Sequence, residues 1–95
     1  MDALDNEPDL RAFLRDGRIT TMPAKRARRL LLLDRVAQHF EPGRQYQEAE
    51  VDAILKGVYD DHATLRRYLI DEGLMSREAG VYWRTGGTVD PQPGA

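Results

Sequence analysis

Apolar side chains recur every three or four positions in three stretches of the chain, and this spacing predicts three main helices. The first stretch, 23–40, contains four consecutive leucines, which cannot share one narrow stripe. This helix is therefore expected to bury a wide arc of its surface at the centre of the core. The second stretch, 48–59, has the most regular stripe, which is formed by Val51, Ile54, Leu55, Val58 and Tyr59.

The third helix is followed at once by a pattern typical of a β-hairpin. The helix is expected over 62–72, and Asp60 and Asp61 precede it as caps for its first turn. Two strand-like runs follow, at 74–77 and 81–84, and a three-residue loop that ends in glycine joins them. We expect these two runs to pair as a hairpin.

The ends of the chain have weaker patterns. Apolar spacing predicts a short helix over 8–15, and short extended segments are expected at 18–21 and 44–46. From residue 85 the chain is almost without apolar side chains, so 85–95 is expected to be a disordered tail.

The order of these elements predicts a fold class. From the first main helix onward it is helix, strand, helix, helix, strand, strand, which is the order of a winged helix-turn-helix. We therefore predict a mainly α fold with a small β-hairpin, a winged helix-turn-helix. The 95 residues suffice for a single domain. It is expected to span 1–84, with the short N-terminal helix at 8–15 and the core at 18–84.

Charge is distributed unevenly along the chain. Its 14 basic and 16 acidic residues leave a formal net charge of −2, whereas a dedicated nucleic-acid binder is usually basic. Residues 17–44, however, contain seven bases and two acids, and residues 63–84 contain four bases and three acids. Nucleic-acid binding therefore depends on whether these two basic segments share one face.

Composition argues against several classes of protein. No apolar run approaches the roughly 20 residues that a membrane helix needs, so no membrane partner is expected. The acidic N-terminus lacks the apolar segment of a secretory signal. The absence of cysteine excludes disulfides and fits a cytoplasmic location.

Several motifs together resemble a known family. They are Pro23 with the basic cluster after it, Phe40 before a Pro-Gly turn, Tyr46 with Glu48 and Glu50, and Asp61 with Leu65, Arg66 and Arg67. Over roughly residues 10–84 the chain resembles a bacterial domain of unknown function. That domain occurs alone and at the C-terminal end of some ArsR-type and related transcriptional regulators. The resemblance implies a winged-helix-like fold and a regulatory role.

The third helix contains the residues that a winged helix would place nearest the DNA bases. If its apolar face packs on the core, Arg66 points away from the core and Arg67 lies to one side. In a winged helix this outward face enters the major groove, where arginine can read guanine edges. The predicted contacts are His62, Thr64, Arg66 and Arg67. The alternative is that these side chains are solvated or paired with acids nearby, such as Asp71.

Two further basic groups are candidates for phosphate contacts. The densest cluster, at the start of the first main helix, consists of Lys25, Arg26, Arg28 and Arg29. Positive charge there opposes the helix dipole, so its presence favours a use in binding phosphates. On the hairpin, Arg77 and Arg84 would hold the wing to the DNA backbone. The alternatives are a solvated face, pairing with the acidic helix 48–59 and, for Arg84, a strand end in water.

No pattern indicates catalysis. His39 and His62 are the only histidines, and no ligand spacing accompanies them. Ser76 is the only serine, and the chain has no Gly-rich phosphate loop. We therefore expect neither an enzyme nor a bound cofactor or metal ion.

Two functions remain in competition at this point. The leading hypothesis is a DNA-binding transcriptional regulator of winged-helix type, with double-stranded DNA as its partner. Because regulators often pair half-sites, a homodimer is a candidate, with 8–15 either as the dimer element or packed across the core. The alternative is a winged-helix protein–protein interaction or effector-sensing module that does not bind DNA. The net charge and the acids beside the third helix favour this alternative.

Overall fold

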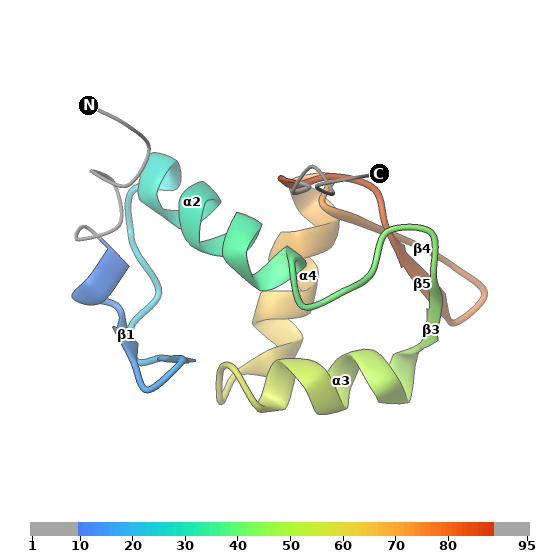
Figure 1. Ribbon diagram of the computed structural model, residues 1–95, viewed down its shortest axis with the longest axis horizontal. Helices are drawn as coiled ribbons and strands as arrows, with labels where there is room; N and C mark the ends of the chain where they lie inside the picture. Colours follow the sequence, from blue (N-terminus) through green and yellow to red (C-terminus); the bar gives the residue numbers. More distant parts are fainter. Residues whose placement is uncertain (1–9, 89–95) are drawn as a thin grey trace, which may run out of the picture.

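The computed structural model describes residues 10–88, which form three helices and five short strands (Figure 1). The elements are, in order, β1 (Leu14–Arg15), β2 (Arg18–Ile19), α2 (Arg26–Ala37), β3 (Gln45–Gln47), α3 (Glu48–Lys56), α4 (His62–Asp71), β4 (Met75–Glu78) and β5 (Val81–Arg84). Strands β1 and β2 pair as one antiparallel hairpin. The other three strands form an antiparallel sheet in the order β3-β5-β4.

The predicted fold class, a mainly α winged helix-turn-helix, is wrong. The described residues form a mixed α/β domain with two small antiparallel sheets. The elements from α2 to β5 do follow the predicted order, and the hairpin at β4 and β5 is present. However, β3 joins this hairpin as a third strand, with Tyr46 opposite Tyr82. A second sheet also forms near the N-terminus, where no sheet was predicted.

The second sheet replaces part of the predicted helix 8–15. Residues 10 and 11 are helical, but Leu14 pairs with Ile19 across a tight turn. Asp16 and Gly17 occupy that turn with φ values of 53° and 79°. Two consecutive positive φ values are incompatible with a right-handed helix but suit a two-residue hairpin turn, for which Asp-Gly is a favoured pair. The chain therefore reverses at a point where we predicted only the end of a helix.

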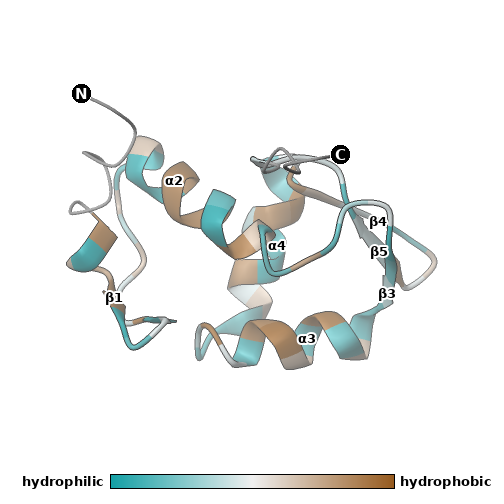
Figure 2. Ribbon diagram, in the orientation of Figure 1, coloured by the Kyte–Doolittle hydropathy of each residue, from teal (hydrophilic) through white to brown (hydrophobic). Residues whose placement is uncertain are grey.

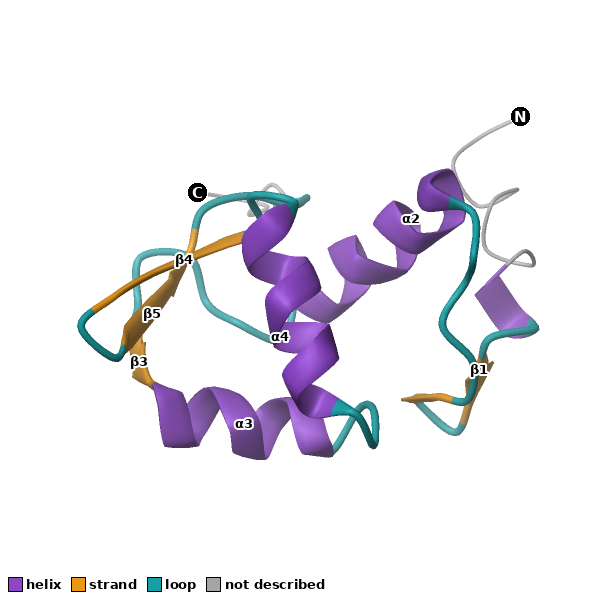
Figure 3. Cartoon of the chain, turned by 180° about the vertical axis from the view of Figure 1, so that it is seen from behind, coloured by secondary structure: helices purple, strands orange, loops and turns teal. Residues whose placement is uncertain are grey.

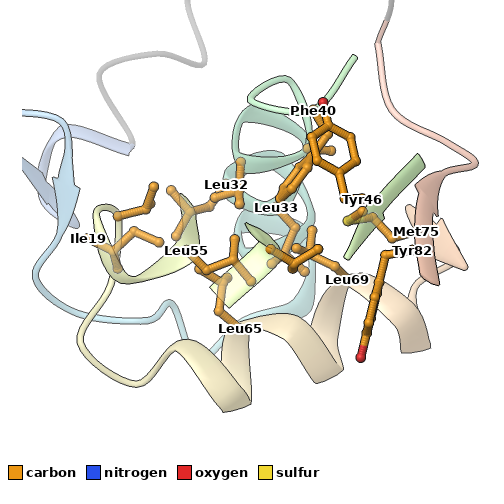
Figure 4. Close-up of a cluster of buried hydrophobic side chains, with 14 of the residues drawn as sticks. Ile19, Leu32, Leu33, Phe40, Tyr46, Leu55, Leu65, Leu69, Met75 and Tyr82 are labelled. Atoms are coloured by element: carbon orange, nitrogen blue, oxygen red, sulfur yellow. The ribbon is translucent and has the colours of Figure 1, made fainter. Parts of the chain in front are cut away.

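The core lies where the three helices meet the three-stranded sheet (Figure 4). Leu33 of α2, Leu55 of α3 and Leu65 of α4 are completely buried, as the apolar spacing predicted. Leu10 is also buried, so this residue of the proposed dimer element packs into the core. Figure 2 shows apolar and polar residues alternating along the helices, as expected when each helix buries one face.

The start of the predicted tail is attached to the domain. Thr88 donates its backbone N–H to Asp34 at 2.6 Å and its hydroxyl at 2.9 Å. Arg84 extends along the same segment and donates to the carbonyl oxygens of Phe40, Gly86 and Thr88. The rest of the predicted tail and residues 1–9 lie outside the described residues. Between residues 10 and 88, none of the helices has the length and apolar character needed to cross a membrane.

Candidate functional site

A hollow of about 340 Å³ lies between the outer face of α4 and the β4–β5 hairpin. We call it the α4 hollow. Its lining residues are Ala63, Arg66, Arg67, Ile70, Asp71 and Arg77. All but Arg77 come from α4, where helical spacing places them away from the buried Leu65 and Leu69. Seen from behind, α4 crosses in front of α2 (Figure 3).

Arg66 is held from the side of α3. Its Nη1 forms an ion pair with Oδ1 of Asp52, and the two side chains are 21% and 24% exposed. The pair joins α3 to α4 at one wall of the hollow. Arg66 is therefore held by an ion pair and is not the freely solvated residue that one of the two alternatives describes.

Arg77 belongs to a second contact that also leads to α3. Its Nη1 lies 3.4 Å from the hydroxyl of the buried Tyr82, which donates to Oε1 of Glu48 at 2.7 Å. The hydrogen bond with Tyr82 raises the pKa of Arg77 above its ordinary value, so the guanidinium keeps its charge. At 3.4 Å the contact is long for a hydrogen bond, and most donors of Arg77 remain available to a ligand.

Arg67 is the cation of the hollow whose side chain has no partner among the described residues. It is exposed, and its guanidinium makes no hydrogen bond or ion pair with any residue between 10 and 88. Among the described residues that line the hollow, Asp71 is the one carboxylate. The hollow therefore presents three guanidinium groups and one carboxylate around Ala63 and Ile70. Such a surface can bind an oxyanion, because guanidinium groups match the geometry of phosphate and carboxylate.

The basic cluster at 25–29 lies beside α4, and two of its four members, Arg26 and Arg29, are engaged in contacts within the domain. Arg26 donates to both carboxylate oxygens of Glu72, at 2.7 and 3.2 Å. The guanidinium of Arg29 lies 4.9 Å from the centre of the Tyr68 ring, and it also donates to the carbonyl oxygens of residues 23 and 24. Lys25 and Arg28 are exposed, and their side chains have no hydrogen-bond or ion-pair partner in the described part of the chain. Only these two members of the cluster remain free for a ligand.

The other predicted contact residues do not line the hollow. Thr64 donates its backbone N–H and its hydroxyl to Asp61, at 3.2 and 2.8 Å, and so completes the cap of α4. These hydrogen bonds hold the pKa of Asp61 below its ordinary value. Arg84 is occupied by three carbonyl oxygens. His62 is partly buried in the first turn of α4, outside the lining.

Three of the ten predicted contact residues thus meet in one place, namely Arg66, Arg67 and Arg77. The residues that hold two of them, Asp52 and the pair Tyr82 and Glu48, were not predicted as part of a site. No local pattern pairs residues that are 14 and 34 positions apart. Within 10–88 no group of three or more His, Cys, Asp or Glu side chains is arranged to hold a metal ion.

Glu72→Gln is expected to reduce the pH dependence of stability. The hydrogen bonds from Arg26 hold the pKa of Glu72 below its ordinary value. Ionised Glu72 therefore stabilises the fold above the pKa of the unfolded chain, and this contribution is lost as pH falls through the lower pKa of the folded state. Thermal unfolding should show the wild type melting above the variant near pH 7, with the difference shrinking below about pH 4. A difference that stays constant from pH 7 to pH 3 would contradict the ion pair, and the exposed Glu78→Gln serves as the control.

Comparison with family models matches residues 18–84 to a family described as "Uncharacterized protein conserved in bacteria (DUF2087)". The match covers more than half of the chain and most of the described residues. It confirms the predicted resemblance to a bacterial family of unknown function. No curated protein and no solved structure matches the chain.

Proposed function

The chain belongs to this bacterial family, and we propose that it binds double-stranded DNA through phosphate contacts at the α4 hollow and acts in transcriptional regulation. The observation that supports this most is the convergence of Arg66, Arg67 and Arg77 on one concave surface. Phosphate contacts supply most of the affinity of non-specific DNA binding, so a surface of this kind is sufficient for association.

The distribution of charge supports the same proposal. Residues 10–88 contain all 14 basic residues of the chain and 11 of its 16 acidic residues, so the described domain has a formal charge of +3. The net charge of −2 arises because the remaining five acids lie in residues 1–9 and 89–95. The charge of the whole chain therefore gives little reason to reject a polyanionic partner.

Arg67 and Arg77 are assigned the main phosphate contacts. Both are exposed, and both present several unoccupied donors at the hollow. Lys25 and Arg28 would add contacts beyond the hollow, because the ion pair of Arg26 with Glu72 brings the start of α2 beside the end of α4. Arg84, Arg26 and Arg29 are given no role in binding.

The proposal is tested by titrating mixed-sequence duplex DNA with the wild-type protein at several salt concentrations. Two to four phosphate contacts should give a log–log slope of affinity against salt of about −2 to −4, at about −0.9 for each contact. Fluorescence anisotropy of a labelled duplex measures this slope. Absence of binding at low salt would contradict the proposal.

A protein-interaction role is the second candidate. It is favoured by Ala63 and Ile70, which make part of the lining of the hollow apolar, and by Asp71, which places a carboxylate where DNA would approach. Apolar area at the centre and charge at the rim are typical of protein interfaces. If duplex DNA fails to bind at low salt, this candidate takes the place of the first.

A further inference from the structure

Two carboxylates of α3 lie one helical turn apart, and each is linked to an arginine of the α4 hollow, one directly and one through Tyr82. Asp52 forms an ion pair with Arg66. Glu48 accepts a hydrogen bond from Tyr82, whose hydroxyl also contacts Arg77. The first contact is between full charges, whereas the second acts through a neutral hydroxyl. Asp52 is therefore the acid that most directly neutralises an arginine of the hollow.

The ion pair between Arg66 and Asp52 is open to competition. It consists of one contact between Nη1 and Oδ1, so it lacks the two parallel hydrogen bonds of the strongest arginine–carboxylate pairs. Both side chains are about one-fifth to one-quarter exposed, so solvent and ligands reach the pair. A phosphate in the hollow would meet an arginine that is already paired and a negative charge directly beside it.

We propose that Asp52 competes with the bound phosphate for Arg66 and thereby limits the affinity of the hollow for DNA. This inference rests on the proposed function. Arg67 and Arg77 make the phosphate contacts in the wild-type protein, and Arg66 adds another only when the charge of Asp52 is removed. Asp52 is thus a determinant of affinity that lies outside the lining of the hollow.

The alternative is that Asp52 positions Arg66 for the ligand, and this role predicts the opposite change in DNA affinity. If Asp52 aimed Arg66 at the ligand, as carboxylates often orient a functional group, removing its charge would weaken binding. The side-chain geometry favours competition, because the carboxylate occupies an Nη1 donor, and Nη groups are those that arginine uses in forked contacts with phosphate. A measured affinity therefore decides between the two roles.

Asp52→Asn is the first test, because the amide keeps the shape and the acceptor oxygen of the side chain but removes its charge. Competition predicts that the variant binds mixed duplex DNA about three- to tenfold more tightly at low salt. It also predicts a salt dependence steeper by about 0.9, which corresponds to one additional phosphate contact. Adding Arg66→Ala to the variant should abolish both the tighter binding and the steeper salt dependence.

Two further variants separate the competing explanations. Asp16→Asn makes the same change in net charge in the exposed β1–β2 turn, where asparagine tolerates the positive φ of 53°. It should leave the affinity nearly unchanged. Asp52→Ala removes the same charge and should raise the affinity for DNA under competition, whereas it should lower the affinity if Asp52 positions Arg66. This second variant keeps the test decisive even if Asp52→Asn folds poorly.

The outcomes distinguish this inference from the function on which it rests. If the wild type binds DNA and Asp52→Asn binds no more tightly, competition by Asp52 is overturned while DNA binding stands. An equal gain in Asp16→Asn would also overturn it, since the effect would then be one of net charge. If the wild type does not bind at low salt, the proposed function itself is overturned, whatever Asp52→Asn does.

Discussion

Replacement of both Arg67 and Arg77 by alanine is expected to weaken DNA binding about tenfold to a hundredfold at low salt, because two charge-assisted phosphate contacts are lost. The log–log salt dependence should also become shallower by about 1.8. The side chain of Arg67 has no hydrogen-bond or ion-pair partner among residues 10–88, and that of Arg77 has one long contact with Tyr82, so the fold should persist. Anisotropy titrations measure the affinity, and circular dichroism checks the fold.

A matched double substitution tests which of the two basic surfaces contacts DNA. Lys25→Ala with Arg28→Ala removes the same number of exposed charges from the start of α2, where neither side chain has a hydrogen-bond or ion-pair partner in the described part of the chain. This variant should lose less affinity than the one altered at Arg67 and Arg77. If only the change at Lys25 and Arg28 weakens binding, DNA lies on the start of α2 and the assignment to the α4 hollow is wrong.

Phe40→Ala is expected to lower the free energy of unfolding by about 3–5 kcal/mol. Phe40 is 1% exposed, and its ring meets that of Tyr46 edge to face with centroids 5.1 Å apart. The substitution removes buried apolar surface, leaves a cavity and loses the aromatic pair. Small domains are stable by only about 5–15 kcal/mol, so the loss is a large share of the total. Urea denaturation of both proteins measures it.

Leu31→Ala is the control for this change, because Leu31 lies in α2, which ends three residues before Phe40, but is 39% exposed. Its effect should stay within about 0.5 kcal/mol, as for most surface substitutions. Similar losses for the two variants would show that the packing of Phe40 between α2 and the sheet has been misassigned.

The helices and the second hairpin were predictable because their apolar spacing is local information. The expected helix at 62–72 is α4 at 62–71, and the expected strands at 74–77 and 81–84 are β4 and β5 within one residue. The fold class was not predictable in the same way. It depends on the pairing of β3 with β5, which joins residues 45–47 to residues 81–83. A segment of three residues has no local sequence pattern that predicts which distant strand it pairs with.

The roles of the arginines show the same limit. Arg26 and Arg84 look like exposed cations in the sequence, but their partners lie 46 and 44 positions away. Burial of Tyr82 likewise sets the place of Arg77, and no spacing rule relates Tyr82 to Glu48. The cap that Asp61 forms with Thr64 was different, because a spacing of three residues at a helix start is a local signal.

Binding of DNA at the α4 hollow is tested most directly by nuclear magnetic resonance, with the ¹⁵N-labelled protein titrated with mixed-sequence duplex DNA at low salt. The largest changes in amide chemical shift are expected at Ala63, Arg67, Ile70 and Arg77, which line the hollow. Changes concentrated instead around Gly17 and His39, beside β1 and the end of α2, would contradict this placement. So would a spectrum that DNA leaves unchanged.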